Sequence, residues 1–382
     1  MAKNRIVKFS LFFLFFTVTS ISTGLISSQK KDLSGVDKNV PVVSNPLNPT
    51  LIKGQSSQMY ITEDLRIGTV KGSDEYMFGE IREIAVDDDG QIFVLDTKKT
   101  LINVYDKNGL YKKTIGRHGQ GPGELQAPQR MSKTWQDEIF VEDHGARAFV
   151  YYTLDGLYSR RVTFSSVFIF TTGIDSLGNI VGVMQTPGEK GNRQVINRYD
   201  PELNYMHTLG YPIEENRSEY NYFKSRLKWA AFKGDHIIFA FPENYEFYIY
   251  DAQGTLVQKI EKEYKPVRIS QEELAYMRSV VRLPATVKNI VPKHHDAFKR
   301  ITVDDQNRIF VETWEKTKDG NGFIYDVFGP DGLCFARVPL HFNFGRFSLF
   351  LNPIVWKNGK VYAREEDEDG YQFVVRYSVH WE

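Results

Sequence analysis

The chain has 382 residues, of which 48 are basic and 48 acidic, so its formal net charge is zero. Proteins that bind nucleic acid without sequence preference need a basic surface that neutralises phosphates. The composition therefore argues against a nucleic-acid partner, and the single cysteine, Cys334, excludes an internal disulfide.

Residues 1–28 are predicted to be a signal peptide that is removed on export. Lys3, Arg5 and Lys8 precede an apolar run over 11–18, and small residues follow it. The run is short for a membrane-spanning helix, so a retained N-terminal anchor, the one expected attachment to a membrane, is the less favoured alternative. Removal would leave 45 basic and 48 acidic residues. We therefore expect a periplasmic or extracellular protein.

Residues 29–58 are expected to form a flexible linker. They are rich in Ser, Asn, Pro, Lys and Gly and show little periodicity. We expect them to bury nothing and to add little stability. The following residues, 59–382, contain all the repeats of the chain.

A turn followed by an apolar strand recurs six times in residues 59–382. The first apolar positions of the six copies are 92, 139, 180, 237, 309 and 361. In most copies an aromatic residue and a second tight turn follow about a dozen residues later, as at 105–109. Two hairpins per unit, with strands that are apolar at consecutive positions, predict an all-β fold. The expected architecture is a six-bladed β-propeller of four-stranded antiparallel blades.

Two further elements are predicted outside the regular repeats. The last repeat ends in a third strand without a fourth, while residues 65–70 resemble an outer strand that has no blade of its own. We expect residues 65–70 to pair with 373–377, which completes the sixth blade and closes the ring. Ser270 with Glu273 forms a capping-box pattern, which predicts a short helix inserted near 270–281.

Residues 78–128 resemble an NHL-type repeat. The matching segments are 84–87, 90–96, 102–106 and 116–124. From about residue 59 the chain is similar to secreted bacterial six-bladed NHL-like propellers. The resemblance implies binding of proteins or other macromolecules. Some six-bladed relatives are enzymes, but no residue set here matches their metal sites.

The glycine-rich loop 116–128 is one candidate binding element. Its exposed backbone N–H groups, with Arg117 and His118 as further donors, could hold an anion. The favoured alternative is an ordinary connector that crosses from one blade to the next. A phosphate-binding loop would need a Lys-Ser/Thr ending and a following helix, which are missing.

A second candidate set follows the second strand of blade two, where a propeller loop can reach one mouth of the ring. Its members are Glu142, Asp143, His144 and Arg147. The alternative interpretation is surface charge. Acidic runs at 87–89 and 365–369 depart from a calcium-loop pattern, and His294 and His295 would point to opposite faces of a strand. We expect no metal and no cofactor, and Cys334 is expected to be a buried structural thiol.

The favoured functional hypothesis is a binding or scaffolding module of the cell envelope, acting as a monomer on a protein, peptide or glycan. No linear catalytic motif is present, which disfavours an enzyme and leaves its catalytic residues unknown. The alternative is a hydrolase or lyase with its site at the central channel, because propeller enzymes collect single residues from different blades. A structural element of a larger envelope assembly is a third option.

Overall fold

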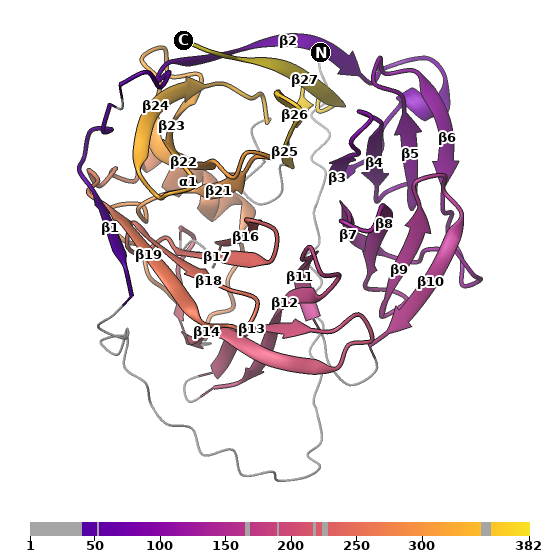
Figure 1. Ribbon diagram of the computed structural model, residues 1–382, viewed down its shortest axis with the longest axis horizontal. Helices are drawn as coiled ribbons and strands as arrows, with labels where there is room; N and C mark the ends of the chain where they lie inside the picture. The colour runs from indigo at the N-terminus through magenta and orange to yellow at the C-terminus, as the bar shows by residue number, and fades with distance from the viewer. Residues whose placement is uncertain are drawn as a thin grey trace. The chain divides into compact units, whose positions relative to one another are not determined.

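The computed structural model describes residues 40–51, 53–164, 169–188, 191–216, 219–223, 228–344 and 353–382. The predicted signal peptide and residues 29–39 of the predicted linker lie outside these ranges. The chain divides into Met1–Asn39 and Val40–Glu382, and all that follows concerns the second unit. Six blades of four antiparallel strands each are arranged around a centre, with one strand added to blade 4 and one separate two-stranded pair (Figure 1).

The first three blades follow one another along the chain, with the inner strand first and the outer strand last. Blade 1 contains β3 (Ile81–Val86), β4 (Ile92–Asp96), β5 (Leu101–Tyr105) and β6 (Tyr111–Ile115). Blade 2 contains β7 (Pro128–Lys133), β8 (Glu138–Asp143), β9 (Ala148–Thr153) and β10 (Tyr158–Thr163). Blade 3 contains β11 (Ile169–Ile174), β12 (Ile180–Pro187), β13 (Gly191–Tyr199) and β14 (Tyr205–Asn216).

The other three blades have the same strand order, except that the last blade takes its outer strand from the N-terminal side. Blade 4 contains β16 (Lys228–Phe232), β17 (His236–Phe241), β18 (Glu246–Tyr250) and β19 (Leu256–Lys262). Blade 5 contains β21 (Arg300–Val303), β22 (Ile309–Lys316), β23 (Phe323–Phe328) and β24 (Cys334–Leu340). Blade 6 contains β25 (Ile354–Lys357), β26 (Lys360–Glu366), β27 (Gln372–Trp381) and β2 (Met59–Ile67).

The hydrophobic core lies between neighbouring blades. The run Ile92–Leu95 in β4 is wholly buried, as a strand packed on both faces must be. Between blades 4 and 5, the Phe247 ring lies 5.5 Å from the Phe298 ring and 5.4 Å from the Phe328 ring, measured between centroids. Each fully buried aromatic side chain of this kind contributes roughly 1.5–3 kcal/mol, so stability is distributed around the ring. The predicted six-bladed propeller is thereby confirmed.

The ring closes as predicted, by pairing of the two ends of the propeller. Strand β2 is antiparallel to β27, with Leu65 opposite Arg376 and Ile67 opposite Val374. The strand is longer and earlier than expected, because it begins at Met59 and ends at Ile67. Val70, which falls within the predicted pairing range 65–70, lies beyond the strand and is 41% exposed.

The expectation that residues 29–58 form a flexible linker that buries nothing is wrong for part of that segment. Val42–Asn45 form β1, which pairs in parallel with β19 at the outer edge of blade 4. Asn45 is buried, donates through Nδ2 to the carbonyl oxygen of Gly332, and accepts at Oδ1 from the backbone N–H of Cys334. The segment therefore connects the outer strands of blades 4 and 5. The strand β1 has only four residues, which is too short to show periodicity in the sequence.

The predicted helix is confirmed as α1 (Gln271–Val280), in the connector from β19 to β21. The Ser270 side chain accepts from the backbone N–H of Glu273, whose side chain accepts from the Ser270 backbone N–H, as in a capping box. Leu274 and Met277 pack against Phe223. The short strands β15 (Glu219–Tyr220) and β20 (Lys288–Asn289) pair in parallel and join this connector to the one from blade 3. A single 3₁₀ turn, η2 (Asp74–Tyr76), precedes blade 1.

The hairpins between the first and second strands of the blades bond to one another around the ring. We call these six turns the hairpin ring. Asn307 and Asn358 adopt positive φ values of 58° and 53°, which asparagine tolerates, and both bond to a neighbouring blade. The six contacts are Lys133 with Asp88, Gln136 with Ser176, Ser176 with Gly234, Lys233 with Asn307, Asn358 with Asp305, and Asn358 with Asp88. Each turn of the hairpin ring is thus hydrogen-bonded to both of its neighbours at this end of the channel.

We predict that the closing strand makes stability dependent on acid pH through Asp64. Partial burial raises the pKa of Asp64, but bonds from Lys360, Ser378 and Arg376 outweigh it and lower the pKa from 3.8 to about 2. Because the pKa is lower in the folded state, the stabilisation is complete above about pH 4 and is lost as the pH falls towards 2. Urea midpoints between pH 2 and 6 should therefore fall less steeply in Asp64→Asn than in the wild type.

The control for this prediction is Asp155→Asn, which removes a carboxylate that is 96% exposed. Its acid dependence should match that of the wild type. Identical pH profiles for Asp64→Asn and the wild type would contradict the assignment.

Candidate functional site

Ten charged side chains gather at the end of the channel opposite the hairpin ring. In an antiparallel blade the inner strand begins where the second strand ends, so these residues share one mouth of the ring. They come from blades 5, 6, 1 and 2, which are consecutive around the centre (Figure 1). We call them the charged arc: Glu80, Arg82, Glu83, Arg130, Glu142, Lys299, Arg300, Glu312, Arg364 and Glu366.

The inner strands of blades 1 and 2 contribute the first part of the charged arc. Arg82 donates from Nη2 to Oε1 of Gln129 at 2.8 Å, and Arg130 Nη1 lies 2.5 Å from Oε1 of Glu83. Burial works to lower the pKa of Arg130, but the Glu83 and Glu142 carboxylates outweigh it and raise that pKa. Arg130 is therefore held as a cation in a partly dry environment, whereas burial lowers the pKa of Arg82. The two arginines join β3 to β7.

Blade 5 contributes a buried glutamate between two cations. Lys299 Nζ lies 2.5 Å from Oε1 of Glu312, and Arg300 Nε lies 3.2 Å from Oε2. Burial raises the pKa of Glu312, yet the two cations lower it overall, so the carboxylate stays ionised. The Lys299 ammonium also lies over the Phe323 ring, 3.4 Å from its centroid.

Blade 6 completes the charged arc between these two parts. Arg364 donates from Nη2 to Oε2 of Glu366 at the end of β26. Burial lowers the pKa of Arg364, while the charges of Glu366 and Glu80 work to raise it. Glu80 is also 3.7 Å from Arg82 Nη1, so its carboxylate lies between the cations of blades 6 and 1.

The charged arc holds five cations and five carboxylates. This balance gives alternating donors and acceptors without an excess of either sign, which suits a partner of mixed charge better than a phosphate-rich one. Most of the acids are paired with arginine or lysine, and the described residues contain no group of three or more His, Cys, Asp or Glu placed to hold a metal ion.

The candidate loop 116–128 already contains an anion of its own. Arg117 donates from Nε to Oε1 of Glu124 at 2.8 Å, and the Gly121 backbone N–H donates to Oε2 of the same carboxylate. These contacts lower the pKa of Glu124, the backbone bond from Gly121 being the larger cause. His118 is exposed at the surface. The geometry supports the connector interpretation, with the glutamate organising the turn.

The second candidate set divides into structural and exposed residues. Asp143 is buried and accepts backbone N–H groups from Gln126, Ala127, Gly145 and Ala146, so it fixes the loops around it. Glu142 belongs to the charged arc and contacts Nε2 of half-buried His144. Arg147 is exposed in the turn that follows. Glu142 and Asp143 are the last two residues of β8. The sequence had predicted that they follow this strand.

Sequence reasoning missed most of the charged arc, although a signal existed. Glu83, Arg130, Lys228 and Arg300 occupy equivalent inner-strand positions. Each lies opposite the fourth residue counted from the first apolar position of its second strand. A charge recurring at one position of an otherwise apolar repeat indicates a shared environment. A recognisable turn precedes each second strand and makes the repeats easy to align in the sequence. The inner strands have no such turn before them, so their equivalent positions are found only from the pairing register in the structure.

The predicted histidine pair resolves into one buried and one half-buried residue. His295 is 5% exposed and stacks on Trp314 with ring centroids 3.7 Å apart. Its Nε2 lies 3.2 Å from Oε1 of Glu273 on α1. Burial raises the pKa of Glu273, but bonds from His295 and Ser270 lower it to about 2. His295 therefore holds the helix against β22, beside the charged arc.

Comparison with known proteins agrees with the fold. Residues 67–178, from the end of β2 through blades 1 and 2 to the first hairpin of blade 3, match the family model described as "DUF5128: 6-bladed beta-propeller". No curated protein matches the sequence. Within the described residues, no helix has the length and apolar character needed to cross a membrane.

Two solved structures from Bacteroides are similar over most of their length. A protein of Bacteroides fragilis, described as a candidate exported protein, superposes with a TM-score of 0.54 at 10% identity, covering 89% of this chain and 99% of that chain. A DUF4221 family member from Bacteroides vulgatus gives a TM-score of 0.52 at 10% identity, covering 86% and 100%. At this identity the likeness establishes the fold alone, which is a six-bladed β-propeller.

Proposed function

We propose that this protein is an exported, NHL-like propeller that binds a protein or peptide segment at the charged arc, in the periplasm or outside the cell. The observation that carries the proposal is the set of paired charges at one mouth of the channel, opposite the hairpin ring. The proposal of export rests on the pattern of residues 1–28.

The chemistry of the charged arc favours a polypeptide over a glycan or a phosphate-rich ligand. Five cations beside five carboxylates can exchange their internal bonds for bonds to a segment that carries both acidic and basic side chains. The faces of Trp314 and Phe323 near Lys299 add the aromatic surface that binding hot spots favour. Electrostatic matching of this kind mainly sets specificity and association rate.

A displayed library of random dodecapeptides, selected against the chain from residue 40 onward, tests the proposal. Selected peptides should carry charges of both signs and bind more weakly as salt increases. Arg82→Gln combined with Arg300→Gln should weaken the binding of the selected peptides at least about tenfold, because each substitution removes a charge-assisted bond. Dissociation constants by fluorescence anisotropy provide the measurement.

The matched control is Lys107→Gln combined with Lys112→Gln, which removes two exposed charges at the other end of blade 1. Peptide affinity should be unchanged in this control. If both double variants bind the selected peptides as the wild type does, the charged arc is not the binding site. Stoichiometric calcium or zinc in the purified protein would instead support the alternative of an enzyme.

A further inference from the structure

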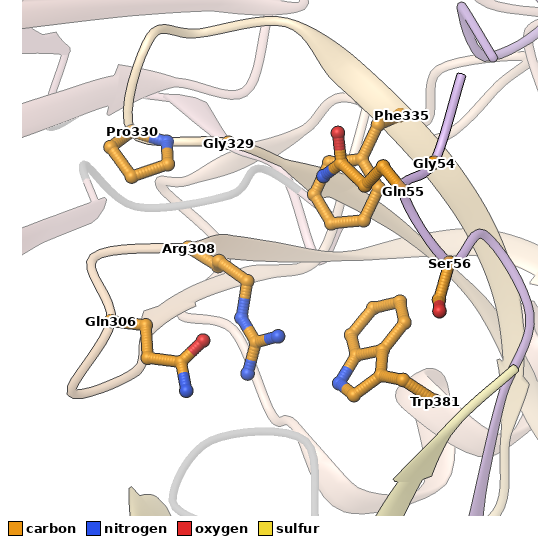
Figure 2. A pocket seen from close by; sticks show the side chains of 9 residues that line it. All are labelled: Gly54, Gln55, Ser56, Gln306, Arg308, Gly329, Pro330, Phe335 and Trp381. Atoms are coloured by element: carbon orange, nitrogen blue, oxygen red, sulfur yellow. The ribbon is translucent and has the colours of Figure 1, made fainter. Parts of the chain in front are cut away.

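A second polar site lies on the same end of the molecule as the hairpin ring, between blades 5 and 6. It is a cavity of about 560 Å³, within the range of small-molecule sites. Its walls come from three distant parts of the sequence, which are the N-terminal segment 54–56, the two hairpins of blade 5, and the end of β27 (Figure 2). The closure of the propeller therefore creates this cavity.

One wall presents hydrogen-bond donors that the described residues leave unused. Arg308 is held by a bond from Nε to Oδ2 of Asp304 at 2.6 Å, and no described residue accepts from its two Nη atoms. The indole Nε1 of Trp381 also has no hydrogen-bond partner among the described residues, but this atom is buried, so Trp381 offers the cavity its ring and not its N–H. Figure 2 shows the Arg308 guanidinium and the Trp381 indole side by side, with 4.9 Å between the guanidinium carbon and the ring centroid.

The rest of the lining combines neutral polar groups with apolar surface. Gln55, Ser56 and Gln306 present amide and hydroxyl groups whose side chains bond to no described residue. Phe335 and Pro330 add apolar surface, and no Asp or Glu is among the residues that line the cavity in the described part of the chain. Asp304, the nearest acid to Arg308, also accepts the backbone N–H groups of Gln306 and Arg308, so its oxygens are committed.

We propose that this cavity binds an acidic sugar, a pyranose ring that carries one carboxylate. The forked Nη atoms of Arg308 suit a carboxylate, which they can bind with two parallel bonds. The amides and the hydroxyl suit ring hydroxyl groups, because both donate and accept. Trp381 and Pro330 suit the C–H face of the ring. The site is separate from the charged arc and from any ligand bound there.

The experiment titrates glucuronate into the chain from residue 40 onward and follows binding by calorimetry and by tryptophan fluorescence. Glucose and acetate serve as probes for the sugar and the carboxylate alone, and both should bind at least about tenfold more weakly than glucuronate. Arg308→Lys keeps a cation beside Asp304 but loses the two parallel Nη donors, and it should weaken glucuronate binding about tenfold. Arg82→Gln with Arg300→Gln should leave glucuronate affinity unchanged.

Gln306→Ala provides a second variant, because the exposed Gln306 side chain bonds to no described residue and its loss should leave the fold intact. This variant should also weaken glucuronate binding. Melting curves establish that each variant is folded. Absence of saturable glucuronate binding by the wild type would overturn the proposal. So would equal affinity for acetate and glucuronate, or unchanged affinity in folded Arg308→Lys and Gln306→Ala.

Discussion

A chain that begins at residue 68 should fail to melt cooperatively, whereas a chain that begins at residue 40 should melt as a stable domain. Starting at residue 68 removes β2 and leaves β27 as an unpaired edge. Met59 and Ile67 are buried in β2, and burial of two such side chains contributes roughly 3–6 kcal/mol. That loss approaches the total stability of about 5–15 kcal/mol that a domain typically has. Circular dichroism melts provide the measurement.

A chain that begins at residue 51 separates the contribution of β1 from that of ring closure. It keeps β2 but loses Asn45, whose side chain makes bonds to Gly332, Glu261 and Cys334. At a net 0.5–1.5 kcal/mol each, these bonds predict a loss of roughly 2–4 kcal/mol. Asn45→Ala in the chain from residue 40 should reproduce most of it. Equal melting temperatures for chains starting at 51 and 68 would contradict closure by β2.

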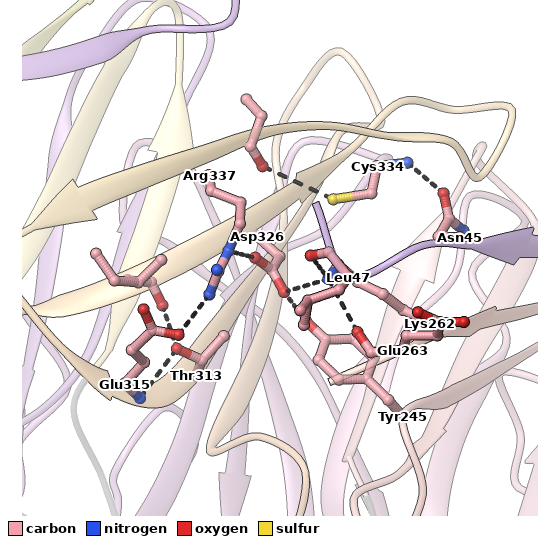
Figure 3. A network of polar contacts seen from close by, with 12 residues as sticks. Asn45, Leu47, Tyr245, Lys262, Glu263, Thr313, Glu315, Asp326, Cys334 and Arg337 are labelled. Atoms are coloured by element: carbon pink, nitrogen blue, oxygen red, sulfur yellow. Dashed lines mark hydrogen bonds and ion pairs between the residues drawn. The ribbon is translucent and has the colours of Figure 1, made fainter. Parts of the chain in front are cut away.

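Asp326→Ala should destabilise the protein by about 3–5 kcal/mol, because it leaves a buried cation unpaired. Lys262 and Asp326 have side chains only 1% and 2% exposed, with 3.6 Å between Nζ and Oδ2. The same carboxylate accepts from Tyr245 Oη and Arg337 Nε, both at 2.7 Å (Figure 3). Urea denaturation at neutral pH measures the loss.

Two variants show whether the unpaired charge is the cause. Asp155→Ala removes an exposed carboxylate and should change stability by less than about 0.5 kcal/mol. Combining Lys262→Met with Asp326→Ala should recover part of the loss, because no buried cation then remains beside the missing acid. A cost below about 1 kcal/mol for Asp326→Ala, or a double variant no better than the single one, would show that solvent or another group compensates Lys262.

Cys334 lies beside the same network (Figure 3). Its side chain is fully buried, and burial is the main cause that raises the pKa of its thiol to about 12. The predicted burial of this thiol is thus confirmed. Its backbone N–H, bonded to Asn45, is the part of this residue that contributes to the connection between blades 4 and 5.

The sequence by itself determined the propeller, because each blade repeats local signals. Turn residues such as Gly90 and Gly109, with positive φ, flank apolar runs such as 92–95, and these signals act over a few residues. The capping box of Ser270 and Glu273 is equally local and was equally predictable. The orphan strand ending at Ile67 was identifiable because a ring with an unpaired edge is unstable.

Only the tertiary structure decided where function could reside. Arg82 and Glu83 lie 48 and 47 residues before Arg130, and only the register of blade packing brings the two inner strands together. The cavity beside Arg308 needs residue 55 and residue 381 as neighbours, which ring closure alone provides. The role of Asn45 depends on a parallel pairing over more than 200 residues. Such contacts depend on the closed ring as a whole, which no short segment encodes.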